Sequence, residues 1–413
     1  MPVPRSHQLR EIAQRFGTPV YVYDAECVRA QFASLRAFDT IRYAQKACSN
    51  IHVLRLLREC GAVVDCVSPG ELERALRAGF EPGRTPAEIV YTADILTPAT
   101  VEHLAQLRIP LNAGSEDMLT QIGKRSPGHP VWLRLNPGFG HGHSKKTNTG
   151  GESSKHGIWH EHLSAALSCV DRYQLELVGF HMHIGSGSDL THLGLVCDAM
   201  VDAVVSSGRD VRAISGGGGL PIPYRPGEPV ADVAAHYRRW DESRRRIEQH
   251  LGHRVELEVE PGRYLTGPAG VLLSEVRSVK HVGRNHFTLV DAGFNDLARP
   301  TLYGAYHHLS LLPRHEEPSP RPEHPTVVAG PLCESGDVFT QLEGGDVEPR
   351  SLQAAEVGDW IIFHDTGAYA ASMASNYNSR PLAPEVLIDG EEVRLIRRRQ
   401  SIEELLALEL QLS

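Results

Sequence analysis

Lys46 is the residue whose position points most directly to chemistry. It stands between a short apolar stretch, 41–44, and an amphipathic pattern, 51–60. The pattern predicts a strand that ends on this lysine, where a parallel α/β fold opens its pockets. An amine buried there among apolar neighbours has a lowered pKa and becomes a nucleophile. A lone lysine at a strand end more often reaches solvent, so other residues must decide its role.

Two motifs further along the chain suit a phosphorylated, cationic ring. Four glycines, 216–219, follow a predicted strand, and backbone N–H groups in such turns bind phosphate. Glu260 ends another strand and would neutralise a buried cation such as a pyridinium nitrogen. Arg263 offers a planar fork for a phosphate or a carboxylate. A plain tight turn and a Glu260–Arg263 ion pair would explain the same residues without a ligand.

A histidine motif completes this group. His183 lies in the stretch 181–187, His-Met-His-Ile-Gly-Ser-Gly, and could stack on a flat ring while Ser186 donates a hydrogen bond to a phosphate. The alternative is a satisfied core histidine. An amine, a phosphate turn, an acid and an imidazole together describe a pyridoxal phosphate site, and their joint occurrence favours this interpretation over chance.

The C-terminal third carries three polar clusters, 294–303, 330–337 and 365–369. Arg299 and Tyr303 could hold a carboxylate. Cys333 lies in a Pro/Gly turn beside Glu334, which suits an exposed thiol that gives a proton and a carboxylate that meets an ammonium. A buried structural cysteine is the alternative for Cys333.

The elements that must position these residues alternate regularly in the first two thirds of the chain. Helical patterns separate eight strand-like runs: 41–47, 62–68, 89–92, 109–113, 131–136, 175–184, 211–215 and 255–260. This is the count of a (β/α)8 barrel, although a doubly wound sheet also alternates. The barrel is favoured because the unusual residues, Asp65 and Arg134 among them, fall at the C-terminal ends of strands.

From residue 270 the pattern changes to strands without regular helices, with a closing helix at 401–410. This indicates a second, all-β domain of barrel or sandwich type. We therefore expect a barrel domain over 25–268 and a β domain, built from 1–24 and 269–413, that completes the active site.

Composition narrows the class of protein. The chain has 413 residues and a net charge of −9, which gives no basic footprint for nucleic acid. We find no apolar run of membrane-span length and no signal pattern. Seven scattered cysteines without a CxxC pair indicate free thiols in a reducing cytoplasm. His141 and His143, in a long insertion at 138–160, have no carboxylate nearby, so no metal is expected.

At the level of motifs, the chain resembles the alanine-racemase-like, fold type III pyridoxal phosphate-dependent decarboxylases, and among them the enterobacterial type of the diaminopimelate decarboxylase family. The resemblance covers nearly the whole chain. It is carried by motifs at 43–50, 181–187, 217–219, 260–263, 299–303, 330–336 and 366–369. Gln45 departs from the valine or leucine that many relatives carry before the lysine, which leaves the chemistry unchanged.

The resemblance implies a fold, a reaction and a role for each motif. It implies decarboxylation of meso-2,6-diaminopimelate to L-lysine and CO2, the last step of lysine biosynthesis, in a homodimer with shared active sites. Lys46 would hold pyridoxal 5'-phosphate as a Schiff base and Cys333 would return a proton after CO2 leaves. The other cofactor-binding residues would be His183, Ser186, Gly217, Gly218, Gly219, Glu260, Gly262, Arg263 and Tyr369. The substrate-binding residues would be Arg263, Arg299, Tyr303, Glu334 and Tyr369.

Two alternatives stay open. A decarboxylase of a simpler basic amino acid, such as ornithine or arginine, would share the barrel chemistry, although such relatives have an acidic group where this chain offers Arg299. A non-catalytic pyridoxal phosphate-binding protein would share the barrel but lack the β domain and its cysteine loop. Release of CO2 from each amino acid separates all three.

Overall fold

The computed structural model describes residues 5–84, 86–140, 149–183, 185, 189–315 and 321–410. Contacts divide the chain into two compact units. The barrel unit comprises Gln31–Pro221 and Val230–Tyr264, and the β unit comprises Met1–Ala30, Ile222–Pro229 and Leu265–Ser413.

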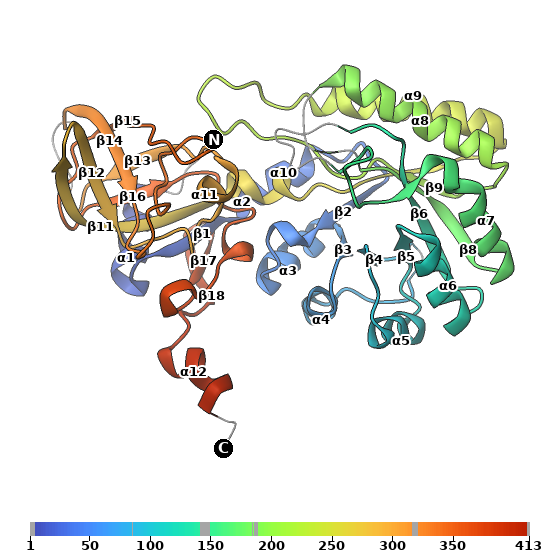
Figure 1. Cartoon of the computed structure of the whole chain (residues 1–413), viewed down its shortest axis with the longest axis horizontal. Helices are drawn as coiled ribbons and strands as arrows, with labels where there is room; N and C mark the ends of the chain where they lie inside the picture. Colours follow the sequence, from blue (N-terminus) through green and yellow to red (C-terminus); the bar gives the residue numbers. More distant parts are fainter. Residues whose placement is uncertain are drawn as a thin grey trace. The chain divides into compact units, whose positions relative to one another are not determined.

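Parallel strands close into a ring in the barrel unit, and Figure 1 labels most of them together with the helices around them. The strands are β2 (Thr40–Ala44), β3 (Val63–Cys66), β4 (Ile89–Ala93), β5 (Leu111–Ala113), β6 (Pro130–Asn136), β8 (Glu176–His181), β9 (Ala213–Ser215) and β10 (Glu256–Val259). Each pairs with the next, and β10 pairs back with β2. The short β7 (Ile158–Trp159) adds to β6 outside the ring. This closure confirms the predicted (β/α)8 barrel and excludes the open doubly wound sheet.

Helices connect these strands and start and stop where local chemistry dictates. They are α3 (Ile51–Cys60), α4 (Pro69–Ala78), α5 (Pro98–Leu107), α6 (Glu116–Arg125), α7 (Leu163–Arg172), α8 (Leu190–Ser207) and α9 (Val233–Leu251), with α2 (Ala25–Ala33) before β2. The side chains of Ser68, Thr97 and Ser115 accept hydrogen bonds from first-turn N–H groups. Gly61 and Gly79 end their helices in the left-handed conformation.

The barrel strands bury both an apolar cluster and an ion pair. Val90, Trp132 and Ala213 form the apolar cluster. Arg42 on β2 donates to both carboxylate oxygens of Glu258 on β10, at 3.0 and 3.1 Å, and both residues are buried. A buried pair of this kind needs both partners, because either alone would be an uncompensated charge.

Helix α8 corrects one expectation from the sequence. Its 18 residues have a mean hydropathy of 1.3, which is long and apolar enough by composition to cross a membrane. In the structure, however, α8 follows β8, precedes β9 and packs against α9. It takes the place of an ordinary barrel helix, since helices that cover a parallel sheet are apolar on the covered side.

The β unit is built on a mixed sheet. Its strands are β1 (Val20–Asp24), β11 (Gly270–Val282), β12 (Asn285–Val290), β13 (Leu309–Leu312), β14 (Glu323–Ala329), β15 (Arg350–Gln353), β16 (Trp360–Phe363), β17 (Glu385–Asp389) and β18 (Glu392–Arg397). The main path runs β15-β14-β12-β11-β1-β17-β18, and β16 joins β13 to β11. The all-β prediction is confirmed. The sequence pattern missed β13 and β15.

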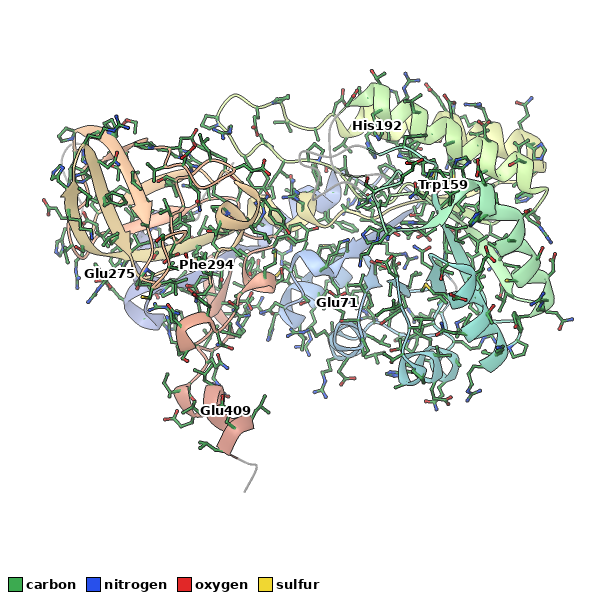
Figure 2. The ribbon with its side chains drawn as sticks, viewed as in Figure 1. Glu71, Trp159, His192, Glu275, Phe294 and Glu409 are labelled. Atoms are coloured by element: carbon green, nitrogen blue, oxygen red, sulfur yellow. The ribbon has the colours of Figure 1, made fainter. Side chains whose placement is uncertain are left out.

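One apolar cluster holds the β unit together. Leu9 and Ile12 of α1 (Ser6–Phe16) pack against Val22, Leu273 and Ile362 on neighbouring strands. Two further helices lie in this unit, α11 (Arg299–Tyr303) and α12 (Ile402–Leu410). The helix expected at 401–410 is confirmed as α12; it has no buried residue, and Glu409 marks it in Figure 2.

Candidate active site

Lys46 lies at the C-terminal ends of the barrel strands, but not on a strand. β2 ends at Ala44, and a short 3-10 helix, η1 (Gln45–Ala47), carries the lysine. Its side chain is exposed, so of the two possibilities left open by the sequence, the structure shows a lysine that reaches solvent and not one buried among apolar neighbours. The turn buries Gln45 and Ala47 and directs the residue between them outward. The structure therefore supplies an accessible amine at the mouth of the barrel.

Glu260 is the buried acid of the barrel mouth and directly follows β10. Its Oε2 is 2.8 Å from His181 Nε2, and the Ser215 hydroxyl donates to Oε1 at 3.3 Å. Burial raises the pKa of Glu260, but the potential of His181 and its hydrogen bond outweigh burial and leave the pKa below its ordinary value. The carboxylate is therefore ionised inside the protein. The sequence interpretation had given His181 and Ser215 no role.

His183 and the glycine turn are joined by a hydrogen bond. The Gly218 N–H donates to His183 Nδ1 at 3.0 Å, so the ring proton of the neutral imidazole lies on Nε2. Burial, and then the charges of Lys46 and Arg134, lower the pKa of His183 well below its ordinary value. The histidine is therefore a neutral, oriented ring at the same end of the barrel as Lys46.

The glycines allow this close packing. A Cβ on Gly217, which has φ +62°, would lie 2.6 Å from the Met182 carbonyl oxygen, and one on Gly218 would lie 2.5 Å from the Glu260 carbonyl oxygen. The Gly217 N–H donates to the Ser215 hydroxyl at 3.2 Å, so two of the three predicted phosphate donors have internal acceptors. Among the described residues, the Gly219 N–H has none.

Two charged residues on the barrel strands add to the site, although the sequence interpretation gave them no role. Burial, and then the charge of Glu260, raise the pKa of Asp65 to about 7, and its Oδ1 has no hydrogen-bond partner in the described part of the chain. Arg134 on β6 is 9% exposed, and no described residue accepts a hydrogen bond from its guanidinium. Because a buried guanidinium without a hydrogen-bond acceptor is costly, this end of the barrel suits an anionic ligand.

Asn136 and Thr149 fasten the insertion that follows β6 to the barrel. Asn136 Nδ2 donates to the Gly151 carbonyl at 3.1 Å, and its Oδ1 accepts from Gly138 and Gly151 N–H groups. The Thr149 hydroxyl donates to the His183 carbonyl at 2.7 Å and accepts from the Gly185 N–H at 2.6 Å. The insertion thus orients the His183 turn. The predicted Ser186 and the two insertion histidines, His141 and His143, lie outside the described residues.

Gly262 and Arg263 lie just after Glu260. A Cβ on Gly262 would lie 3.1 Å from the Ala44 carbonyl oxygen, so glycine lets this turn approach the strand that precedes Lys46. Arg263 begins the short helix α10 (Arg263–Thr266) and is half-buried. It lies three residues after Glu260. Its role in holding phosphate or carboxylate stays a prediction.

In the β unit, Cys333 lies on an exposed loop with a rigid base. Its N–H donates to Asn378 Oδ1 at 2.9 Å. The buried Asp337 carboxylate accepts from the Leu332 N–H at 2.8 Å and from the Phe294 N–H at 2.7 Å (Phe294 is labelled in Figure 2). These bonds fix the turn on both sides of the cysteine. The sequence interpretation had given Asp337 and Asn378 no role, because nothing in the sequence shows which loop an isolated polar side chain will support.

The predicted substrate-binding residues of the β unit differ in exposure. Arg299 is 7% exposed, whereas Glu334 is exposed beside Cys333. Tyr303 ends α11 and is half-buried. Tyr369 is half-buried with a φ of +57°, a backbone conformation that is uncommon for a non-glycine residue and that clusters at functional sites.

The residues of the barrel mouth fit pyridoxal phosphate. Lys46 offers an accessible amine, Glu260 an ionised acid for a ring nitrogen, and His183 a neutral ring. Arg134 and the Gly219 N–H are donors without an acceptor among the described residues. An anionic, aromatic cofactor with a basic ring nitrogen would give each of these groups a partner.

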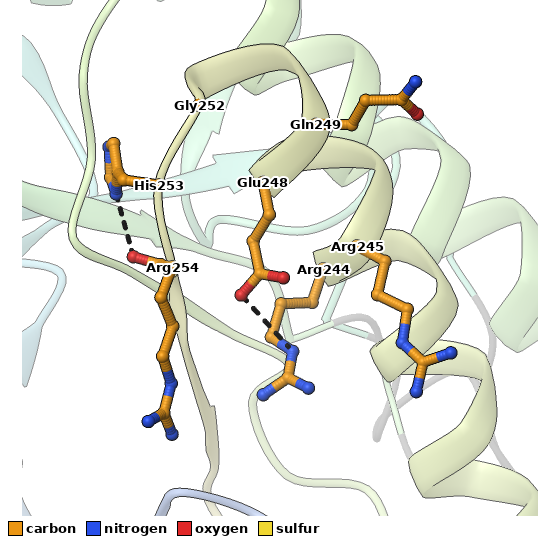
Figure 3. Close-up of a pocket in the computed structure, with 7 residues that line it drawn as sticks. All are labelled: Arg244, Arg245, Glu248, Gln249, Gly252, His253 and Arg254. Atoms are coloured by element: carbon orange, nitrogen blue, oxygen red, sulfur yellow. Dashed lines mark hydrogen bonds and ion pairs between the residues drawn. The ribbon is translucent and has the colours of Figure 1, made fainter.

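A hollow at the end of α9 is lined mainly by charged residues, and these form a structural network of ion pairs (Figure 3). Arg244 and Arg254 both pair with Asp39, at 3.1 and 2.5 Å, and Arg245 pairs with Asp241 at 2.7 Å. This hollow lies at the N-terminal ends of the barrel strands, whereas barrel enzymes place their active sites at the C-terminal ends.

Comparison with known proteins agrees with the geometry of the barrel mouth. Residues 25–267 match the family model described as the pyridoxal-dependent decarboxylase, pyridoxal binding domain. The diaminopimelate decarboxylase of Escherichia coli (strain K12) is 60% identical over 408 residues, which are 98% of this chain and 97% of the relative.

The chain belongs to the diaminopimelate decarboxylase family.

Solved structures support the same assignment. A crystal structure of diaminopimelate decarboxylase has a TM-score of 0.97 at 59% identity and covers 99% of this chain and 97% of that chain. A diaminopimelate decarboxylase from Helicobacter pylori, complexed with L-lysine, has a TM-score of 0.83 at 31% identity, with coverages of 97% and 99%. Members of this family are pyridoxal phosphate enzymes.

The cysteines and the possible metal ligands are the last groups that the sequence singled out. All seven cysteines are free, and six of them are buried or half-buried. No group of three His, Cys, Asp or Glu side chains within the described ranges is arranged to hold a metal ion.

Proposed function

We propose that this protein decarboxylates meso-2,6-diaminopimelate to L-lysine and CO2 with pyridoxal 5'-phosphate, the last step of lysine biosynthesis. The observation that carries the proposal is the 60% identity over nearly the whole chain to diaminopimelate decarboxylases. The barrel mouth supports it, because an amine, an ionised acid and a neutral imidazole lie at one end of the barrel. The protein would thus be a carboxy-lyase.

The cofactor would be held by the barrel unit. Lys46 would bind it covalently through the amine, His183 would cover its ring, and Glu260 would hold a proton on its ring nitrogen. Gly217, Gly218, Gly219 and Ser186 would surround the phosphate, together with Gly262, Arg263 and Tyr369. Pyridoxal phosphate supplies an electron sink for the pair of electrons left when the carboxylate departs as CO2.

The β unit would supply the groups that act on the substrate. Arg299 and Tyr303 would bind the carboxylate that is retained, with help from Arg263 and Tyr369, and Glu334 would bind the distal ammonium. The Cys333 thiol would return a proton to the carbon that loses CO2. Its exposed position suits this step, since a proton donor must reach the reacting carbon.

We further propose a homodimer in which each active site takes Lys46 from one protomer and Cys333 from its partner. The support is the division of the chemistry between two units of the chain. Closed two-fold dimers are the commonest way for two such surfaces to complete one another. No nucleic acid or membrane partner is proposed, and the net charge of −9 gives no reason for one.

A CO2-release assay with the purified protein and added cofactor tests the function. Diaminopimelate, ornithine, lysine and arginine are compared side by side at matched concentrations. We expect turnover of diaminopimelate that exceeds the others by orders of magnitude, because a buried cation left without its carboxylate is costly. Preferred release from ornithine would support the simpler decarboxylase, and a cofactor-loaded protein that releases no CO2 would support a non-catalytic binder.

A further inference from the structure

Arg299 is held more tightly than an ordinary arginine side chain. It starts helix α11 and is 7% exposed. Its Nη1 donates to His307 Nε2 at 2.8 Å, and its Cζ lies 4.6 Å from the centre of the Tyr224 ring. One neighbour fixes the edge of the guanidinium plane, and the other supports its face.

His307 can accept this bond in one protonation state alone. Its Nδ1 is 2.8 Å from the His364 carbonyl oxygen, and a carbonyl can only accept, so Nδ1 carries the proton. In the neutral ring, Nε2 then has a lone pair for the Arg299 N–H. A protonated His307 would set a second N–H and a second positive charge against the guanidinium. The ring, which is 1% exposed, is therefore anchored to the backbone on one side and to Arg299 on the other.

Tyr224 completes the corner. Its ring meets the His307 ring edge to face, with the ring centres 5.3 Å apart. It comes from the stretch Ile222–Pro229, which follows the glycine turn in the sequence but belongs to the β unit by its contacts. The stretch therefore follows the predicted phosphate turn in the sequence and contacts Arg299, which is predicted to bind the substrate carboxylate.

The other charged groups around this corner leave the assignment of His307 as an acceptor unchanged. Arg350 donates to the His307 backbone carbonyl at 2.8 Å, so it does not compete for the ring. Burial raises the pKa of Asp365 to about 6, against the opposing charge of Arg299.

We propose that His307 and Tyr224 are positioning residues that hold the Arg299 guanidinium in one orientation for the retained carboxylate of the substrate, and so set the preference for an amino acid with a second carboxylate. The inference rests on the proposed role of Arg299. A guanidinium carries five N–H donors in one plane, so the bond to His307 is compatible with a two-pronged bond to a carboxylate. Orientation matters because a misplacement of about 1 Å can cost about 100-fold.

The test separates orientation from folding and from the chemical step. His307→Phe keeps an aromatic ring beside Tyr224 but removes the acceptor, whereas His307→Gln places a carbonyl oxygen near the position of Nε2. We expect His307→Phe to raise KM for diaminopimelate about 10- to 100-fold with kcat within about threefold. His307→Gln should recover most of the loss. Tyr224→Leu, which removes the supporting ring, should raise KM in the same direction.

His308→Phe is the matched control, because it makes the same change one residue further along, at an exposed residue whose ring contacts the His364 ring and does not accept from Arg299. It should keep the KM of the starting protein. Melting curves and cofactor content establish that each variant is folded and loaded. Equal losses for His307→Phe and His307→Gln, or a loss confined to kcat, would overturn the inference, as would an unchanged KM in Tyr224→Leu.

The proposed function fails in a different way from this inference. If diaminopimelate is not the substrate, the unmodified protein itself releases no CO2 from it. If the function holds and the positioning role does not, the unmodified protein is active and the His307 and Tyr224 variants keep its KM.

Discussion

Replacing Glu260 with glutamine should abolish most turnover while leaving the barrel folded. The glutamine keeps the shape of the side chain and an oxygen that can accept from His181 Nε2. In the unmodified protein, this nitrogen is 2.8 Å from the Glu260 carboxylate. It loses the negative charge that burial alone would disfavour and that His181 stabilises. The proton on the ring nitrogen of the cofactor then has no buried counter-charge.

The size of the effect follows from the burial of the site. Glu260 is 9% exposed, so the lost charge is poorly replaced by water. Removing one preorganised electrostatic group from such a site costs about 2.7–4 kcal/mol of transition-state stabilisation, or about 100- to 1,000-fold in kcat. The stability cost should be small, about 1 kcal/mol, because the glutamine still satisfies the hydrogen bond from His181.

Glu258 provides the matched control inside the same barrel. It lies two residues earlier, within β10, and its carboxylate is bound by Arg42 at 3.0 and 3.1 Å. Glu258→Gln leaves the Arg42 charge buried without a counter-ion, which costs about 3–5 kcal/mol of stability. It should therefore lower the melting temperature strongly and spare the kcat of the protein that remains folded.

The assay measures CO2 release from diaminopimelate, cofactor content and thermal unfolding for the three proteins. Loss of kcat in Glu260→Gln with little change in melting temperature, and the opposite pattern in Glu258→Gln, supports the reasoning. If Glu260→Gln keeps more than about a tenth of kcat, the carboxylate does not serve the ring nitrogen. If it unfolds like Glu258→Gln, its contribution is structural.

Three further predictions concern other parts of the chain. Lys46→Ala should fold but hold no cofactor covalently. Borohydride treatment followed by mass spectrometry should therefore add no mass to the peptide that contains residue 46. Cofactor mass that is still found on that peptide would exclude Lys46 as the attachment point. Inactive Lys46→Ala and Cys333→Ala homodimers, unfolded and refolded together, should regain substantial activity, because a mixed dimer with shared sites has one intact site; samples that stay inactive despite proven subunit exchange would contradict the shared site. Burial raises the pKa of Asp296 to about 6, above an unfolded value of about 4, so its contribution to stability is complete below pH 4 and is lost as the pH rises through 6. The melting temperature of Asp296→Asn, which cannot titrate, should therefore gain on that of the starting protein between pH 4 and 7, by an amount equivalent to about 2–3 kcal/mol, and a difference independent of pH would refute this.

The sequence by itself determined the architecture, because periodicity is a local property. Eight apolar runs separated by amphipathic patterns predicted the barrel, and each run became a strand within a few residues of its expected bounds. Helix ends were also local, since Ser68 with Pro69 starts one helix wherever that segment lies in the fold. The motif at Glu260 and the glycine turn could be found for the same reason, because their residues are consecutive.

Only the tertiary structure decided the partners of these residues. His181 and Glu260 are 79 positions apart and meet because β8 and β10 are both neighbours of β9 in the closed ring. Lys46 leaves its strand and becomes exposed because η1 buries the residues on either side of it. Tyr224 reaches Arg299 across 75 positions through a stretch without any periodic pattern. Hydrogen bonds and ring contacts between distant residues depend on chain closure, and a sequence pattern records only what each segment does alone.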